Sequence, residues 1–257
     1  ERTGATEMTV LVPTMGALHK GHQALIKRAR TLDKDVIVSI FVNPLQFENT
    51  SELAKYPRSP ERDIEIATIA GATEVWFPEY EDLYPEGFKT LSAGALGNLY
   101  EGSSRPGHFD GVVTVIDRLC AIAKPDKAVF GEKDFQQLTI IKAMKSKIEV
   151  VAVPTVREFD GLAMSSRNLR LSETGRNVAL VIHRALAAAK LAPTVEIAQE
   201  ILNTTLSMES GFDKDYATII DEKDFSLADE GTENRRAIIA GWVEGVRLID
   251  NMPMVGR

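Results

Sequence analysis

The sequence predicts an α/β fold: a parallel sheet with helices on both faces, followed by a smaller α+β domain. Short apolar runs rich in β-branched residues, such as residues 9–12 and 35–42, alternate with amphipathic helical stretches in the first part of the chain. Such runs are typical of parallel strands that are covered on both faces. From residue 172 onward, two helical stretches precede three strand-like runs, which indicates a separate α+β unit. We place the boundary between residues 155 and 156.

The first domain, residues 1–155, is expected to be Rossmann-like. Ser59 and Pro60 are typical of the N-cap and first turn of a helix. The expected strands are residues 9–12, 35–42, 74–77, 126–130 and 149–153. The expected helices follow the turn at 13–22, span 60–70 and 110–123, and open within 131–137.

The second domain, residues 156–257, is predicted from a change of pattern. Two amphipathic helices are expected at 172–191 and 194–207, with Pro193 between them. The strand-like runs are residues 216–220, 237–242 and 246–249, and Gly245 allows a turn between the last two. This arrangement predicts a small α+β domain.

The composition limits the classes of partner. A net charge of −7 over 257 residues argues against broad binding to nucleic acid or anionic membranes. The single cysteine, Cys120, excludes an internal disulfide and gives no metal-cluster spacing. No apolar run approaches the ~18–20 residues of a membrane span, and no signal peptide is visible. We expect a cytoplasmic location, and because the chain opens at Glu1 we expect its true N-terminus to be missing.

The stretch VPTMGALHKGHQALIK, residues 12–27, predicts a phosphate site. It places Gly16, His19, Gly21 and His22 between a strand and a helix. Such a turn is expected to present bare backbone N–H groups at a helix N-terminus, where anions bind. It is neither a Rossmann dinucleotide fingerprint nor a P-loop. The alternative is a strand–turn–helix corner with two surface histidines.

Polar residues follow the other predicted strands. Ligands of open α/β sheets bind beyond the carboxyl ends of strands, where Asn43 and Gln46 come after the second strand and Lys133 and Asp134 after the fourth. Lys133 suits a phosphate or a leaving pyrophosphate, and Asp134 a ribose hydroxyl or Mg²⁺. Gln46 could equally cap a turn.

Four other segments are interpreted from their residue types. Residues 164–167 supply two hydroxyls and a guanidinium that suit a triphosphate, or two serines that cap a helix. Residues 48–60 are expected to form a lid. Glu61 and Asp63 are interpreted as charges at a helix N-terminus rather than metal ligands, and Arg105 and His108 as loop hydrogen bonders rather than phosphate ligands.

The motifs together resemble the pantoate–β-alanine ligase family, within the nucleotidyltransferase superfamily that carries an H-x-G-H signature. The resemblance is carried, in this order, by PTMGALHKGH at 13–22, FVNPLQF at 41–47, YPR at 56–58, RPGHFDGV at 105–112, GEKDFQQL at 131–138 and PTVREFDGLAMSSRN at 154–168. It implies an ATP-dependent ligase that condenses pantoate with β-alanine through a pantoyl adenylate and releases pyrophosphate and AMP. The substrate supplies the nucleophile, so positioning and charge stabilisation are expected to carry the catalysis.

The resemblance also implies roles for individual residues. It implies an ATP site made of Met15, Gly16, Ala17, Leu18, His19, Lys20, Gly21, His22, Gly131, Glu132, Lys133, Asp134, Val156, Met164, Ser165, Ser166 and Arg167. It assigns catalysis to His22, His19, Lys133 and Arg167, with His22 at the general-acid position. Gln46 and Gln137 would hold pantoate, and Gln46 with Asn43 would meet β-alanine. Mg²⁺ is expected mainly through the oxygens of ATP, because magnesium takes few protein ligands and keeps waters. Arg62 stands where some relatives carry an acid, which argues against a protein-borne Mg²⁺ site there. A homodimer is implied as well.

Two other functions compete with this ligase. One is a nucleotidyltransferase whose final product is adenylylated, and the other is a nucleotide-binding module without catalysis. A tRNA synthetase is disfavoured, because the chain is short, acidic and without an anticodon-binding module.

Overall fold

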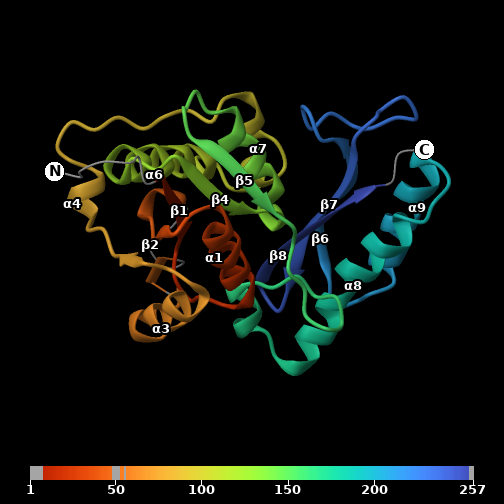
Figure 1. Cartoon of the computed structure of the whole chain (residues 1–257). Helices are drawn as coiled ribbons and strands as arrows, with labels where there is room; N and C mark the ends of the chain where they lie inside the picture. The colour runs from red at the N-terminus through yellow and green to blue at the C-terminus, as the bar shows by residue number, and fades with distance from the viewer. Residues whose placement is uncertain (1–7, 48–52, 55, 255–257) are drawn as a thin grey trace. The chain divides into compact units, whose positions relative to one another are not determined.

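The computed structural model describes residues 8–47, 53–54 and 56–254, and its elements are labelled in Figure 1. The chain divides into two compact units, Glu1–Pro154 and Thr155–Arg257. This division lies one residue from the boundary expected from the sequence.

A parallel sheet forms the centre of the first unit. Among the described residues it has five strands in the order β3-β2-β1-β4-β5, and every neighbouring pair is parallel. The strands are β1 (Thr9–Thr14), β2 (Asp35–Ile40), β3 (Glu74–Trp76), β4 (Lys127–Gly131) and β5 (Glu149–Val153). The predicted fold class is therefore confirmed, although β2 ends at Ile40 rather than at residue 42.

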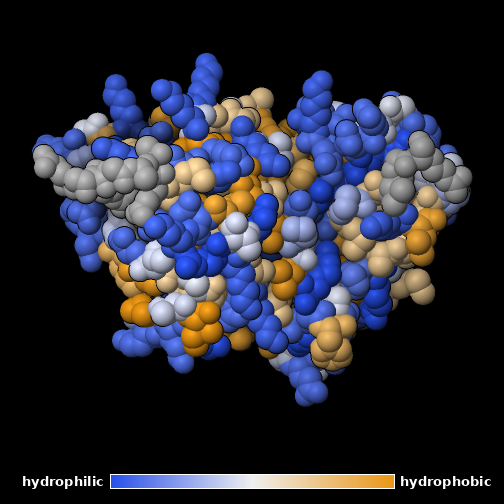
Figure 2. Space-filling view, in the orientation of Figure 1, coloured by the Kyte–Doolittle hydropathy of each residue, from blue (hydrophilic) through white to orange (hydrophobic). Residues whose placement is uncertain are grey.

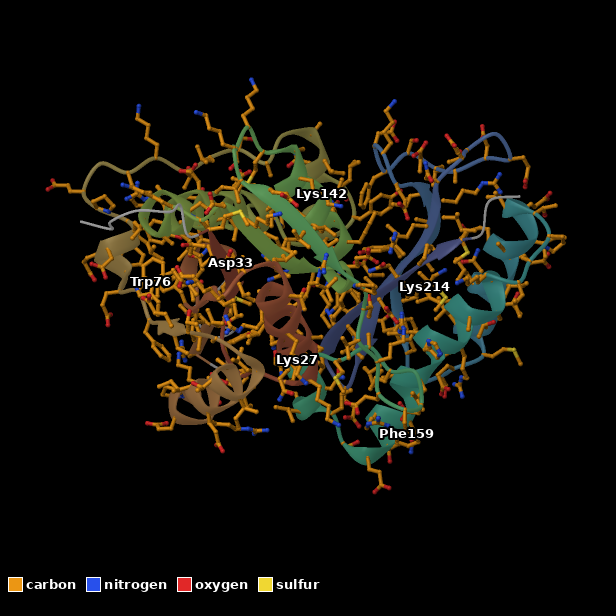
Figure 3. All side chains as sticks on the ribbon, viewed as in Figure 1. Lys27, Asp33, Trp76, Lys142, Phe159 and Lys214 are labelled. Carbon is orange, nitrogen blue, oxygen red and sulfur yellow. The ribbon has the colours of Figure 1, made fainter. Side chains whose placement is uncertain are left out.

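Helices cover both faces of this sheet. The helices of the first unit are α1 (Lys20–Leu32), α3 (Pro60–Ala70), α4 (Tyr80–Leu83), α5 (Glu101–Ser104), α6 (His108–Ala123) and α7 (Phe135–Ala143). Figure 1 shows α1 and α3 on one side of the sheet and α6 on the other. In Figure 3, Lys27 marks the exposed side of α1, and Trp76 marks the end of β3.

Alternation along each strand explains the two layers. Val10 and Val12 join the cluster that packs on α1 and α3. Leu11, which lies between them in the sequence, joins the cluster formed with α6 and α7. Successive side chains of a strand point to opposite faces, so a continuous apolar run requires a helical layer on each side.

The second unit packs two helices on an antiparallel sheet. Its helices are α8 (Glu173–Ala189) and α9 (Val195–Ser207), and its strands are β6 (Asp213–Asp221), β7 (Arg235–Val243) and β8 (Val246–Met254), in the order β6-β7-β8. Ser172 caps α8, because its hydroxyl accepts from the Gly175 N–H at 3.0 Å. Glu244 and Gly245 both have positive φ, at 51° and 72°, as a two-residue hairpin turn requires.

The surface of both units is largely polar. Figure 2 shows hydrophilic residues over much of the visible face, with hydrophobic residues in separate patches. Among the described residues, none of the helices combines the length and apolar character needed to cross a membrane.

Candidate active site

Three polar segments follow neighbouring strands at one edge of the parallel sheet. β1 lies between β2 and β4, and the carboxyl ends of parallel strands share an edge. Residues 15–22 follow β1, residues 41–46 follow β2, and residues 132–137 follow β4. A bond of 3.0 Å from the Phe41 N–H to the Thr14 carbonyl joins the first two segments where their strands end.

The turn between β1 and α1 has an unusual backbone. Gly16 and Ala17 both have positive φ, at 84° and 50°. The left-handed conformation costs an L-residue such as alanine about 1–2 kcal/mol. At position 16 a side chain would also crowd the turn, because a Cβ there would lie 3.0 Å from Asp63 Oδ2 and 3.1 Å from Ile40 Cγ2. The turn therefore needs glycine at 16 and outside support at 17.

Asp63 supplies that support. Its side chain is 1% exposed, and its carboxylate accepts from the N–H of Ala17 at 2.9 Å and of Leu18 at 2.7 Å. Hydrogen bonds to a charged group contribute about 1.5–3 kcal/mol each, enough to offset the strained residue. Asp63 does lie in the first turn of α3, as the sequence favoured, but its carboxylate also contacts a turn 45 residues earlier, which the sequence did not predict.

The expected row of bare amides is not present. Besides the amides of Ala17 and Leu18, the His19 N–H donates to His22 Nδ1 at 3.3 Å, and the Gly21 N–H donates to His19 Nδ1 at 3.1 Å. The prediction that these backbone donors would be open to a phosphate was therefore wrong. Side chains must provide most of the donors for an anion at this turn.

These same bonds set the tautomers of the two histidines. His19 is the N-cap of α1 and His22 is its third residue, and both side chains accept from backbone N–H groups of this turn. Because each Nδ1 accepts a hydrogen bond, each neutral ring carries its proton on Nε2. The ring centroids are 4.1 Å apart. The turn thus presents two neighbouring Nε2–H donors.

Both imidazoles are held neutral. Burial is the largest cause in each case: it lowers the pKa of His19 from 6.5 to about 4, with the Lys133 charge acting in the same direction. Burial, then the neighbouring His19, and finally Lys133 lower the pKa of His22 to about 3, against the opposing charge of Asp134. At neutral pH the two rings are therefore uncharged donors.

These lowered pKa values predict a dependence of stability on pH. The unfolded chain, with histidine pKa near 6.5, takes up protons before the folded chain, so the free energy of unfolding falls as the pH falls from about 6.5 toward 4. We expect thermal melts across this window to show the loss. A His19→Asn/His22→Asn double variant should show a flatter profile, and an unchanged slope would contradict the assignment.

Lys133 and Asp134 lie beside the two rings. They belong to the short helix η3 (Glu132–Asp134), directly after β4, and their side chains pair at 3.4 Å. The structure therefore brings together the histidines and Lys133, as the sequence predicted. Gly131 ends β4 against Leu25 of α1, and Gln137 lies half-buried in α7.

A buried amide network holds Gln46. The Asn43 side chain is fully buried; its Nδ2 donates to the Gly111 carbonyl at 3.1 Å and to Gln46 Oε1 at 3.0 Å. Its Oδ1 accepts from the Leu45 N–H at 3.2 Å and from the Tyr84 hydroxyl at 2.8 Å. Asparagine can make four such bonds, so the geometry argues against the expected contact between Asn43 and β-alanine.

The orientation of Gln46 follows from this network. Backbone groups fix which atom of Asn43 is the amide nitrogen, because the Gly111 carbonyl can only accept and the Leu45 N–H can only donate. Gln46 must therefore turn its Oε1 toward Asn43 and keep its Nε2 for other partners. Sequence reasoning missed Tyr84, whose pKa is raised mainly by burial, so its hydroxyl stays protonated and donates.

Arg105 and His108 hold the backbone of Gln46. The Gln46 carbonyl accepts from Arg105 Nη2 at 3.1 Å and lies 2.9 Å from His108 Nδ1. Arg105 Nη1 is 3.2 Å from His108 Nε2; since arginine only donates, the proton of His108 lies on Nδ1. Both residues are thus loop hydrogen bonders, as the sequence favoured.

The remaining predicted residues belong to the second unit or fall outside the described residues. Val156 pairs with Met164, whose N–H donates to the Val156 carbonyl at 3.0 Å. Ser165 caps the short helix η4 (Ser166–Arg170) by accepting from the Arg167 N–H at 3.2 Å. The predicted lid, residues 48–60, lies partly outside the described residues. No group of three or more metal-ligating side chains occurs in the part of the chain that is described.

The chain matches a known protein family and its relatives over nearly its whole length. The family model described as pantoate-beta-alanine ligase matches residues 1–253. A pantothenate synthetase of Rhizorhabdus wittichii is 44% identical over 251 residues, which cover 94% of this chain and 89% of the relative. A Thermus thermophilus pantothenate synthetase is 43% identical over 255 residues, which cover 94% and 91%.

Solved structures resemble the chain over nearly its whole length. The crystal structure of a pantothenate synthetase from Thermus thermophilus has a TM-score of 0.92 and 42% identity, covering 96% of this chain and 94% of that one. A pantoate-beta-alanine ligase from Francisella tularensis, complexed with beta-gamma ATP and beta-alanine, has a TM-score of 0.80 and 34% identity, covering 98% and 92%.

Proposed function

The chain belongs to the pantoate–β-alanine ligase family, and from this membership we propose how its residues divide the work of the reaction. The reaction is the ATP-dependent condensation of pantoate with β-alanine to pantothenate. A carboxylate oxygen of pantoate bonds to the α-phosphorus of ATP while the bond to the β-phosphate oxygen breaks. The β-alanine nitrogen then attacks the acyl carbon, loses a proton, and AMP leaves with the shared oxygen.

His19, His22 and Lys133 stabilise the charge that develops on the phosphates. The observation that carries this proposal is that two neutral Nε2–H donors follow β1 and the Lys133 ammonium follows β4, close enough for its charge to lower the pKa of His22. Pre-oriented donors aimed at developing charge are a large term in catalysis. Burial lowers the pKa of His22 to about 3, so its ring is neutral at neutral pH and offers a hydrogen bond rather than a positive charge.

Gln46 and Gln137 hold pantoate. Gln46 offers its Nε2–H donors, because its oxygen is used by Asn43, and a carboxylate or hydroxyl oxygen can accept from them. Gln137 follows Asp134 by three positions on the segment after β4, and a spacing of three brings residues to the same side of a helix. A donor pair of this kind favours a small hydroxy acid.

Substituting the partners of Gln46 tests this orientation. Asn43→Ala removes the donor that fixes Gln46 Oε1 and so frees the Gln46 amide to rotate, and we expect the KM for pantoate to rise by about tenfold or more. Tyr84→Phe removes one acceptor contact of Asn43 but leaves both Nδ2 bonds, so its KM should change by less than about threefold. Initial-rate kinetics separate the two, and equal effects would contradict the assignment.

The second unit and Mg²⁺ complete the proposal. Val156 and residues 164–167 are assigned to ATP by the resemblance, with Arg167 on the triphosphate. Magnesium takes few protein ligands and keeps waters. Both carboxylate oxygens of Asp63 already accept from backbone amides. Of the two carboxylates, Asp134, which pairs with Lys133, is therefore the one that could approach Mg²⁺. When bound with ATP, Mg²⁺ neutralises phosphate charge. We also propose that the protein is a cytoplasmic homodimer and that its partners are ATP, pantoate and β-alanine.

A two-stage assay tests the function. With ATP and pantoate alone, the protein should release pyrophosphate, and AMP should appear only after β-alanine is added. Pyrophosphate release with retention of AMP on the final product would favour the rival nucleotidyltransferase. Intact ATP binding without pyrophosphate release would favour a binding module. Light scattering tests the homodimer.

A further inference from the structure

We propose that Asp63 is a positioning residue for adenylate formation, acting through the β1–α1 turn that carries His19 and His22. The proposal rests on the adenylation step described above. Asp63 lies in the first turn of α3 and is 1% exposed, so it acts on a substrate only through the residues that it holds.

Its contacts define one backbone geometry of the turn. One carboxylate oxygen accepts from the Ala17 N–H at 2.9 Å, and the other accepts from the Leu18 N–H at 2.7 Å. Because each oxygen accepts from one backbone N–H, the carboxylate fixes the direction of two consecutive peptide groups. Ala17, which has a φ of 50°, is the residue whose backbone most needs this restraint.

The restraint leads directly to the imidazoles. Leu18 is followed by His19, whose N–H donates to His22 Nδ1 at 3.3 Å, and His19 Nδ1 accepts from Gly21 at 3.1 Å. Each bond depends on where the preceding peptide group points. A turn that loses its restraint before Leu18 therefore loses the bonds that fix both histidine tautomers.

The elements that carry Asp63 and the turn pack together in one apolar cluster. Ile26 and Ala29 of α1 and Ala67 and Ala70 of α3 are buried in the same apolar cluster as Val10 and Val12 of β1. α1 and α3 are thus packed on one face of the sheet, and the carboxylate spans from the second helix to the turn that begins the first. This arrangement lets a single side chain set the position of the turn relative to the strands.

The test compares two identical substitutions at opposite ends of β1. Asp63→Asn keeps the size of the side chain but offers one acceptor, and its NH₂ group faces a backbone N–H. Asp126→Asn is the matched control, because Asp126 Oδ2 accepts from the Thr9 N–H at 2.8 Å at the start of the same strand. Pyrophosphate release with ATP and pantoate, thermal unfolding and nitrogen NMR of the imidazoles are measured for the wild type and both variants.

We expect Asp63→Asn to lower kcat for pyrophosphate release by about 30- to 100-fold with the KM for pantoate changed by less than about threefold. NMR should show Nε2–H tautomers for His19 and His22 in the wild type and tautomer mixtures in Asp63→Asn. The Asp126→Asn variant should keep kcat within about twofold of the wild type and keep its tautomers, even where its melting temperature falls.

A kcat for Asp63→Asn within about threefold of the wild type would overturn the proposal, as would equal losses in both variants. A loss of kcat with unchanged tautomers would overturn it as well. Should Asp63→Asn fail to fold, Asp63→Glu retains the charge but cannot place both oxygens without moving the turn, and full activity in that variant would overturn the proposal. Absence of pyrophosphate release by the wild type would instead refute the proposed function.

Discussion

Replacing Lys133 with alanine should slow pyrophosphate release by about 10³-fold, because a cation that contacts the transferring phosphates typically raises the rate by about that factor. Lys133 follows β4 directly and its charge lowers the pKa of both His19 and His22. Removing it should therefore also raise both imidazole pKa values, which an NMR titration measures. The rate of pyrophosphate release and the two histidine pKa values thus test independently whether Lys133 lies beside His19 and His22.

Lys127 provides the matched control for this change. It begins the strand that Lys133 follows, and it pairs with Glu149 at 2.8 Å. An ion pair with an exposed partner contributes about 0–1 kcal/mol, so Lys127→Ala should retain kcat and leave both histidine pKa values unchanged. Equal losses in the two variants would show that Lys133 supports the strand rather than the chemistry.

Replacing His22 with alanine should lower kcat for pyrophosphate release by about 10²- to 10³-fold, the usual effect of removing one aimed donor. The same change also removes the acceptor for the His19 N–H, so some loss of stability is expected. Steady-state kinetics of pyrophosphate release and thermal unfolding measure the two effects separately.

A second substitution at the same position separates capping from catalysis. Glutamate is a favoured third residue of a capping box, so His22→Glu can accept from the His19 N–H but offers no N–H donor. We expect this variant to recover stability and not activity. Recovery of both would mean that the imidazole serves the helix rather than the phosphates.

Local patterns were sufficient to predict the fold. The continuous apolar run of residues 9–12 predicts a strand covered on both faces, and Val10 and Leu11 do face different helical layers. Ser172 precedes α8 and caps it, as its residue type favours. Gly245 marks the hairpin between β7 and β8. Each of these signals depends on neighbours a few residues away.

Contacts between distant residues explain what the sequence could not predict. Nothing near Asp63 indicates that its carboxylate would bind a turn 45 residues earlier. Asn43 follows a strand at the ligand-binding edge, yet Tyr84 and Gly111 use its amide. The glycines of the first turn suggested bare amides, but amides of this turn donate to the carboxylate of Asp63 and to the Nδ1 atoms of the two histidines. Burial and long-range hydrogen bonds, rather than residue type, decide these roles.

The most direct test of the central claim follows an oxygen atom from pantoate. Pantoate labelled in its carboxylate with a heavy oxygen isotope is converted with ATP and β-alanine, and the AMP is analysed by mass spectrometry. If the carboxylate attacks the α-phosphorus, one labelled oxygen leaves with AMP and the other stays in the amide of pantothenate. Unlabelled AMP, with the missing label found in a phosphate product or in water, would contradict the account.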